Sequence, residues 1–203
     1  MTSSAQTLIK KGIEFLKSGN LSEAKKALVD ALAIEPNNFN ALLNLGLTYA
    51  HSGLLKDAKQ ALFKASEINL NEAEPHYNLG IIYSLEKNTL GAIDAYQKAI
   101  DINPKHLEAS TNLSDLFNQL GRHEEALVAA NQAVKLNSPY LETWLNQGKA
   151  FSGLQNSLNA LKAYKRVLEI QPFHSEGLFC QAHTLDEFCL LYTSPSPRDR
   201  TRS

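Results

Sequence analysis

Residues 39–72 read FNALLNLGLTYAHSGLLKDAKQALFKASEINLNE, and this stretch decides the fold. Apolar side chains return at three- and four-residue intervals, first over Ala41–His51 and again over Lys56–Ile68, which predicts two amphipathic helices. Between them stands Gly53, at a turn where a positive φ is expected. The stretch therefore predicts a helical hairpin.

The same pattern returns along the chain every 34 residues. One slot of the pattern holds a small residue, at Gly12, Gly46, Gly80, Ser114, Gly148 and Ala182. Three positions later comes a large apolar residue, at Phe15, Tyr49, Tyr83, Phe117, Phe151 and Leu185. Nine positions after that comes an alanine, at Ala24, Ala58, Ala92, Ala126 and Ala160. Prolines stand at the ends of alternate units. Because one hairpin cannot bury its apolar face alone, we expect the repeats to stack.

Together these features resemble the tetratricopeptide repeat (TPR). The resemblance implies an all-α fold, a right-handed superhelical solenoid of stacked antiparallel helix hairpins. It covers residues 5–188 of an array predicted over 1–188, with units at about 5–38, 39–72, 73–106, 107–140 and 141–174 and a partial unit at 175–188. The sequence departs from the family pattern at its tryptophan slot, which only Trp144 fills.

Composition narrows the class of protein further. A net charge of −1 argues against general binding to nucleic acid or to a membrane surface. No segment predicts membrane insertion or a signal peptide, and two cysteines are too few for a disulfide framework. We therefore expect a cytoplasmic protein.

A row of asparagines accompanies the repeat. In four successive units an asparagine stands two residues before the small-residue slot, at Asn44, Asn78, Asn112 and Asn146. Asparagine is a mediocre helix former, and the leucines next to it already occupy packing positions. We expect these amides to lie along one face of the first helices, where they can pair with the N–H and C=O groups of an extended peptide.

This row resembles the peptide-binding grooves of kinesin light chains and of O-linked N-acetylglucosamine transferases. The resemblance implies that the four asparagines hold the main chain of a partner, with Tyr77 and Lys149 in neighbouring slots. The alternative is that the amides bond within or between helices. A groove that grips carboxylates is not favoured, because Lys10, Lys17 and Lys149 are too few to converge on one.

No catalytic, cofactor or metal site is predicted. The six histidines are scattered and never take the i, i+4 spacing of a metal-binding helix. There is no glycine-rich phosphate loop, and Cys180 is expected to act as a small apolar filler.

The last residues change character. Cys189–Ser203 reads CLLYTSPSPRDRTRS, and its first eleven residues resemble a translated sequencing-library adapter. We therefore expect a non-native, disordered tail over 189–203 and a natural protein that continues past Phe188. The alternative is a genuine basic tail with Ser-Pro phosphorylation sites.

The sequence thus predicts a non-enzymatic scaffold that binds an extended peptide or a partner protein in a concave groove. One alternative is the N-terminal recruiting region of a truncated multidomain enzyme, such as a glycosyltransferase or sulfotransferase. Another is a structural assembly protein whose apolar inner surface buries another copy of the chain or a subunit. Separately, the open C-terminal end allows self-association.

Overall fold

The computed structural model describes residues 4–136 and 140–193. Within these ranges the chain forms eleven α-helices and no β-strand. They belong to two compact units, Met1–Ala109 and Ser110–Ser203. The boundary falls inside the helix Leu107–Gln119, and each unit is described below by itself.

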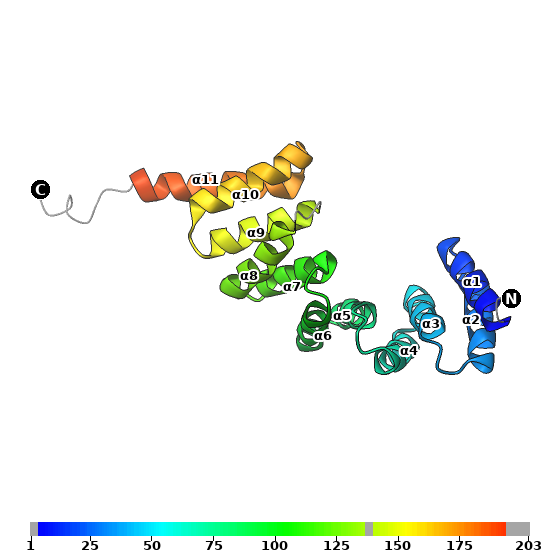
Figure 1. The fold of residues 1–203 in the computed structure, drawn as a ribbon. Helices are drawn as coiled ribbons and strands as arrows, with labels where there is room; N and C mark the ends of the chain where they lie inside the picture. Colours follow the sequence, from blue (N-terminus) through cyan, green and yellow to red (C-terminus); the bar gives the residue numbers. More distant parts are fainter. Residues whose placement is uncertain (1–3, 137–139, 194–203) are drawn as a thin grey trace, which may run out of the picture. The chain divides into compact units, whose positions relative to one another are not determined.

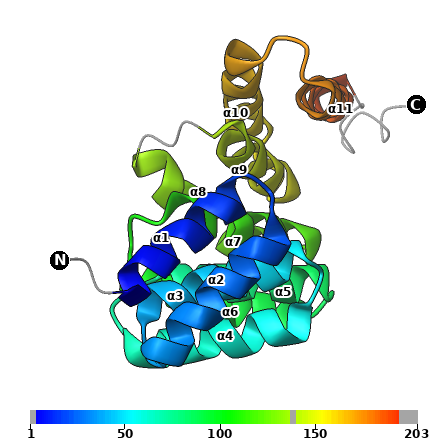
Figure 2. The same ribbon diagram turned by 90° about the vertical axis from the view of Figure 1, so that its right-hand side faces the viewer.

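The unit Met1–Ala109 contains three helical hairpins (Figures 1 and 2). Their helices are α1 (Ser4–Lys17) with α2 (Leu21–Ile34), α3 (Phe39–His51) with α4 (Leu55–Ile68), and α5 (Glu74–Leu85) with α6 (Thr89–Ile102). The first helices of successive hairpins touch, α1 with α3 and α3 with α5. The second helix of each hairpin packs on the first helix of the next, α2 with α3 and α4 with α5.

The unit Ser110–Ser203 holds most of α7 (Leu107–Gln119) and four further helices. These are α8 (His123–Lys135), α9 (Leu141–Gly153), α10 (Ser157–Ile170) and α11 (Ser175–Thr193). α9 and α10 form a hairpin, and α11 packs against both. The predicted fold class, an all-α array of helix hairpins, is confirmed.

The turn inside each hairpin has a left-handed residue at the same place in every repeat. Gly19, Gly53 and Gly121 have φ values of 78°, 74° and 70°. The other two turns use Lys87 at 59° and Gln155 at 57°. The 34-residue period therefore gives the position of all five turns, although only three of them have a glycine that marks a positive φ in the sequence. A side chain at positive φ crowds the following carbonyl, so these two turns carry strain.

The two helices of a hairpin approach each other most closely at the small-residue slot. A Cβ added to Gly46 would lie 2.7 Å from Leu62 Cγ, and one added to Gly80 would lie 2.5 Å from Tyr96 Cδ1. In the fourth repeat, the contact between the two helices of the hairpin is made by different residues. Its first helix has Ser114, whose hydroxyl donates to the Ala126 carbonyl at 2.8 Å, and its second helix has the small Ala130 in the Leu62 position.

Asparagine side chains begin α2, α3, α6 and α10. At α3 the Asn38 oxygen accepts the Ala41 N–H at 3.1 Å, and the Asn38 amide donates to Glu35 Oε2 at 2.7 Å. Such caps satisfy N–H groups that the first helical turn leaves unpaired. The caps fix where each helix starts after its turn.

The predicted disordered tail needs correction. α11 runs on to Thr193, so residues 189–193 are helical rather than disordered. No proline or glycine interrupts the chain between Gly177 and Pro195, and the helix therefore continues past Phe188. The remaining part of that prediction, residues 194–203, lies outside the described residues. Among the described helices none is both long enough and apolar enough to cross a membrane.

Replacing Lys87 or Gln155 by glycine is expected to raise the free energy of unfolding by about 0.5–1 kcal/mol. Relief of the left-handed backbone should outweigh the entropy that glycine adds to the unfolded chain. Urea unfolding followed by circular dichroism measures the change. Gly53→Ala is the matched control in the same turn slot and should be destabilising; a Lys87→Gly protein less stable than the parent would contradict the explanation.

Gly46→Ala is expected to lower the free energy of unfolding by about 1–3 kcal/mol, because the new methyl group would overlap Leu62. A double-mutant cycle with Leu62→Ala tests the cause. In the Leu62→Ala background the cost of Gly46→Ala should shrink markedly. An equal cost in both backgrounds would show that the Leu62 side chain does not set the requirement for glycine.

Candidate functional site

In the unit Met1–Ala109, two of the predicted asparagines stand one repeat apart on the touching helices α3 and α5. The Asn44 amide donates to the Asn40 carbonyl at 2.7 Å, and the Asn78 amide donates to the Glu74 carbonyl at 2.8 Å. Both side chains are half-buried. Within the described residues, neither side-chain oxygen has a hydrogen-bond donor. Each amide is thus held in one orientation and keeps an acceptor available.

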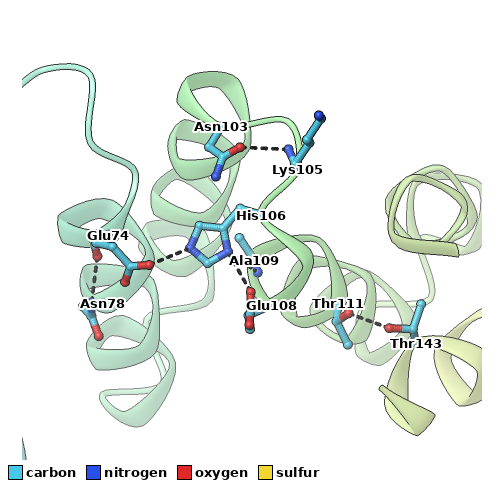
Figure 3. A network of polar contacts seen from close by, with 9 residues as sticks. All are labelled: Glu74, Asn78, Asn103, Lys105, His106, Glu108, Ala109, Thr111 and Thr143. Atoms are coloured by element: carbon cyan, nitrogen blue, oxygen red, sulfur yellow. Dashed lines mark hydrogen bonds and ion pairs between the residues drawn. The ribbon is translucent and has the colours of Figure 1, made fainter. Parts of the chain in front are cut away.

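Tyr77, also predicted to contact a peptide, lies beside Asn78 in a packed aromatic group. Its ring centroid is 4.6 Å from that of His106 and 6.0 Å from that of Tyr96. His106 is 6% exposed. Its Nδ1 accepts the backbone N–H of Ala109 at 3.3 Å. The same nitrogen lies 3.2 Å from Glu108 Oε2 (Figure 3). Tyr77 is therefore anchored by its neighbours and presents a fixed, half-buried surface.

His106 also links this aromatic group to the start of α5. Its Nε2 lies 3.7 Å from a carboxylate oxygen of Glu74, the residue whose backbone carbonyl accepts from Asn78 (Figure 3). Sequence reasoning gave His106 no role. No sequence signal marks it, because its position depends on how the loop after α6 folds back on α5.

The unit Ser110–Ser203 treats its asparagines differently. Asn146 is 4% exposed, and its amide donates to the Thr111 carbonyl at 3.2 Å. The Asn146 backbone carbonyl in turn accepts from the Asn118 amide at 2.8 Å. The hydroxyls of Thr111 and Thr143 pair at 2.8 Å (Figure 3). These bonds join α7 to α9, so the Asn146 side chain connects two first helices. Asn112 lies half-buried on α7.

Lys149 does not offer a free charge. Its ammonium group lies 2.6 Å from Glu176 Oε1, an ion pair that connects α9 to α11. A cavity of about 260 Å³ opens beside this pair, lined by Gly153, Tyr164 and Cys180 among others. Burial raises the pKa of the Cys180 thiol above its usual range, and burial raises the pKa of the Tyr164 phenol. Both groups are therefore neutral at ordinary pH, and Cys180 packs on the core as expected.

A second cavity, of about 340 Å³, lies in the unit Met1–Ala109. Its wall is one face of α1 together with residues at the start of α3. The lining residues are Gln6, Ile9, Lys10, Ile13, Glu14, Lys17, Asn38 and Asn40. The structure thus brings Lys10 and Lys17 to one cavity and leaves Lys149 in the other unit. Lys10 occupies the slot of the asparagine row in the first repeat, which is the sequence signal that marks this cavity.

No group of three or more His, Cys, Asp or Glu side chains able to hold a metal ion occurs among the described residues.

Comparison with protein-family models gives the repeat a name. Tetratricopeptide-repeat models match residues 15–79, 73–106, 107–140 and 141–174. The chain belongs to the tetratricopeptide-repeat family. TPR arrays are protein-interaction modules and not catalytic domains, so this stretch of chain is a scaffold rather than an enzyme.

Solved structures agree with the family assignment. The crystal structure of MamA protein has 28% identity, a TM-score of 0.72, and coverage of 85% of this chain and 94% of that one. YrrB, described as a TPR protein with an unusual peptide-binding site, has 21% identity, a TM-score of 0.72, and coverage of 88% and 92%. A TPR protein from Parabacteroides merdae has 20% identity, a TM-score of 0.74, and coverage of 96% and 81%. A search of curated proteins found no match.

Asn44→Ala and Asn146→Ala provide a matched test of the two environments. Loss of the buried Asn146 amide removes its bond to the Thr111 carbonyl, which joins α9 to α7, and should cost about 1–3 kcal/mol of unfolding free energy. Asn44→Ala removes only a half-buried bond to its own helix and should change stability by less than about 0.5 kcal/mol. Urea unfolding of the two variants measures the difference. Equal costs would contradict the separate roles assigned to the two asparagines.

Proposed function

We propose that this scaffold binds an extended peptide segment of a partner protein along the first helices of the unit Met1–Ala109. Asn44 and Asn78 would hold the peptide main chain, and Tyr77 would contact its side chains. The observation that carries the proposal is the state of the two amides. Each is oriented by a bond to the carbonyl four residues earlier, and each keeps its oxygen without a donor within the described residues.

Geometry of this kind suits an extended chain. A carboxamide has one acceptor and two donors, so an amide that spends one N–H on its own helix can still pair with both the N–H and the C=O of a peptide unit. The existing helix bond also reduces the side-chain entropy lost on binding. YrrB, which shares the fold, is described as a protein with a peptide-binding site, and this supports a peptide as the ligand class.

The proposal gives a smaller part in peptide binding to three other predicted residues, Asn112, Asn146 and Lys149. The Asn146 amide is already bonded to Thr111, and the Lys149 ammonium is already paired with Glu176. Either group would have to give up a protein partner to gain a peptide partner. We therefore place the main-chain contacts at Asn44 and Asn78. Nothing in the comparisons favours the alternative of an enzyme's recruiting arm.

The test uses a phage-displayed library of random 12-residue peptides, selected on the whole chain. Peptides enriched on the parent protein should bind the Asn44→Ala/Asn78→Ala variant at least about ten-fold more weakly, since each lost contact is worth about 1 kcal/mol. Fluorescence anisotropy of the labelled peptides measures the affinities.

Asn37→Ala/Asn71→Ala is the matched control. These two asparagines are exposed, lie in the turns that precede α3 and α5 and are also 34 residues apart. The control should bind like the parent. Failure of the parent to enrich any peptide would refute peptide binding, whereas equal binding by the Asn44→Ala/Asn78→Ala variant would refute the role of the two amides.

A further inference from the structure

The helix α11 buries one face and leaves a second, apolar face exposed. On the buried face, a Cβ added to Gly177 would lie 2.8 Å from a carbon atom of α10, and Thr184 is 1% exposed. On the other face, Leu178 is 43% exposed and Leu185 is 44% exposed, and Ala182 between them is also exposed. These three residues are four and three positions apart, so they lie in a row along the helix. We call this row the α11 stripe.

The equivalent row is covered in every earlier repeat. Ala182 occupies the small-residue slot of the sixth repeat, and in the five earlier repeats the residue in that slot is buried. Those residues are Gly12, Gly46, Gly80, Ser114 and Gly148. At the four glycines the second helix of the same hairpin lies so close that an added Cβ would meet its side chains. No such second helix accompanies α11 in the part of the chain that the structure describes. The α11 stripe therefore has the residue pattern of a helix–helix contact without the second helix.

The α11 stripe is complementary to itself. In two copies of α11 that run antiparallel and cross at Ala182, Leu178 of one copy lies beside Leu185 of the other, because the two leucines stand at nearly equal distances from the crossing. The same pair recurs on the other side of the crossing, which is the symmetry of an isologous contact. Two small residues can meet where helices cross closely, and the fourth repeat already combines them in Ser114 and Ala130.

Antiparallel pairing also separates the charges beside the stripe. Asp186 is exposed and follows Leu185 directly. In a parallel pair the two Asp186 carboxylates would stand at the same height along the helices. In the antiparallel pair they lie about eight residues apart along the axis, which is roughly 12 Å and exceeds the screening length of physiological salt. The antiparallel arrangement is therefore favoured.

We infer that the chain forms a homodimer through the α11 stripe, with the two α11 helices antiparallel and crossing at Ala182. The inference concerns a surface of the unit Ser110–Ser203 and does not depend on peptide binding in the other unit. Burial of Leu178 and Leu185, which water now reaches, drives the association. Each copy contributes one face of one helix, so the interface is small and the dimer is weak and reversible.

Sedimentation velocity of the whole chain, at protein concentrations up to about 0.5 mM, should show a monomer–dimer equilibrium. Leu178→Glu/Leu185→Glu should weaken dimerisation at least about ten-fold, because it places carboxylates in the apolar contact. Leu158→Glu/Phe173→Glu is the matched control, with two exposed apolar residues of the same unit outside α11, and should dimerise like the parent. A parent that stays monomeric throughout would overturn the inference and leave the stripe to a helix of another protein.

A second pair of charges separates loss of the contact from loss of the fold. Leu178→Lys/Leu185→Lys should also be monomeric by itself. Mixed with Leu178→Glu/Leu185→Glu it should form a heterodimer, because each carboxylate then faces an ammonium group of the other copy. If both variants keep the helical circular dichroism signal of the parent and their mixture stays monomeric, the stripe is not the interface.

Disulfide formation tests the crossing point and the direction of the helices. In a Cys189→Ser background, Ala182→Cys should cross-link two copies when diamide is added, because the two residues meet at the two-fold axis. Leu158→Cys in the same background is the control and should not cross-link. Antiparallel pairing keeps the two Cys189 residues of the parent about 20 Å apart, too far for a disulfide. A parent dimer that cross-links through Cys189 would overturn the antiparallel arrangement.

Discussion

The rest of the structure depends on the close approach of the two helices within each hairpin. At Gly12, Gly46, Gly80 and Gly148 the first helix has no side chain, and a large residue sixteen positions later fills the space. Leu28, Leu62, Tyr96 and Tyr164 are that residue, and each is at most 2% exposed. Where the first helix has Ser114 instead, the second has Ala130. Packing constrains the summed volume of the two side chains that face each other at this slot. Helices at van der Waals contact leave no room to add a methyl group.

This constraint frees other positions for function. The packing stripe of α3 is complete with residues such as Leu42, Leu45 and Gly46, so Asn44 beside it is not needed for the core. The environment then decides what each repeated asparagine does. Asn44 and Asn78 stay half-buried and bond to their own helices, whereas Asn146 is enclosed and bonds to the neighbouring helix. The same residue type in the same slot is therefore left available to a ligand in one unit and joins two helices in the other.

The lysines of the unit Met1–Ala109 divide in a similar way. Lys25 lies over the Tyr49 ring at 5.3 Å, and Lys59 lies over the Tyr83 ring at 5.4 Å. Each of these pairs joins the second helix of one hairpin to the first helix of the next, and Lys59 also pairs with Glu86 at 2.6 Å. Cations held against ring faces in this way stabilise the stack and are not available to a ligand. Lys10 and Lys17 are on the first helix, which has no preceding hairpin within the described residues, and they line a cavity instead.

The sequence by itself determined the hairpin, its period and the family, because a 34-residue recurrence of small, aromatic and alanine slots leaves few other ways to bury the apolar faces. It also located three turns through their glycines. It did not reveal the left-handed Lys87 and Gln155, since nothing in those residue types signals a positive φ. Only the tertiary structure distinguished Asn146 from Asn44, packed Tyr77 against His106 and brought Lys10 and Lys17 to one cavity. Each of these depends on which groups a neighbouring helix or loop places within a few ångströms, and the local pattern of the chain does not specify that proximity.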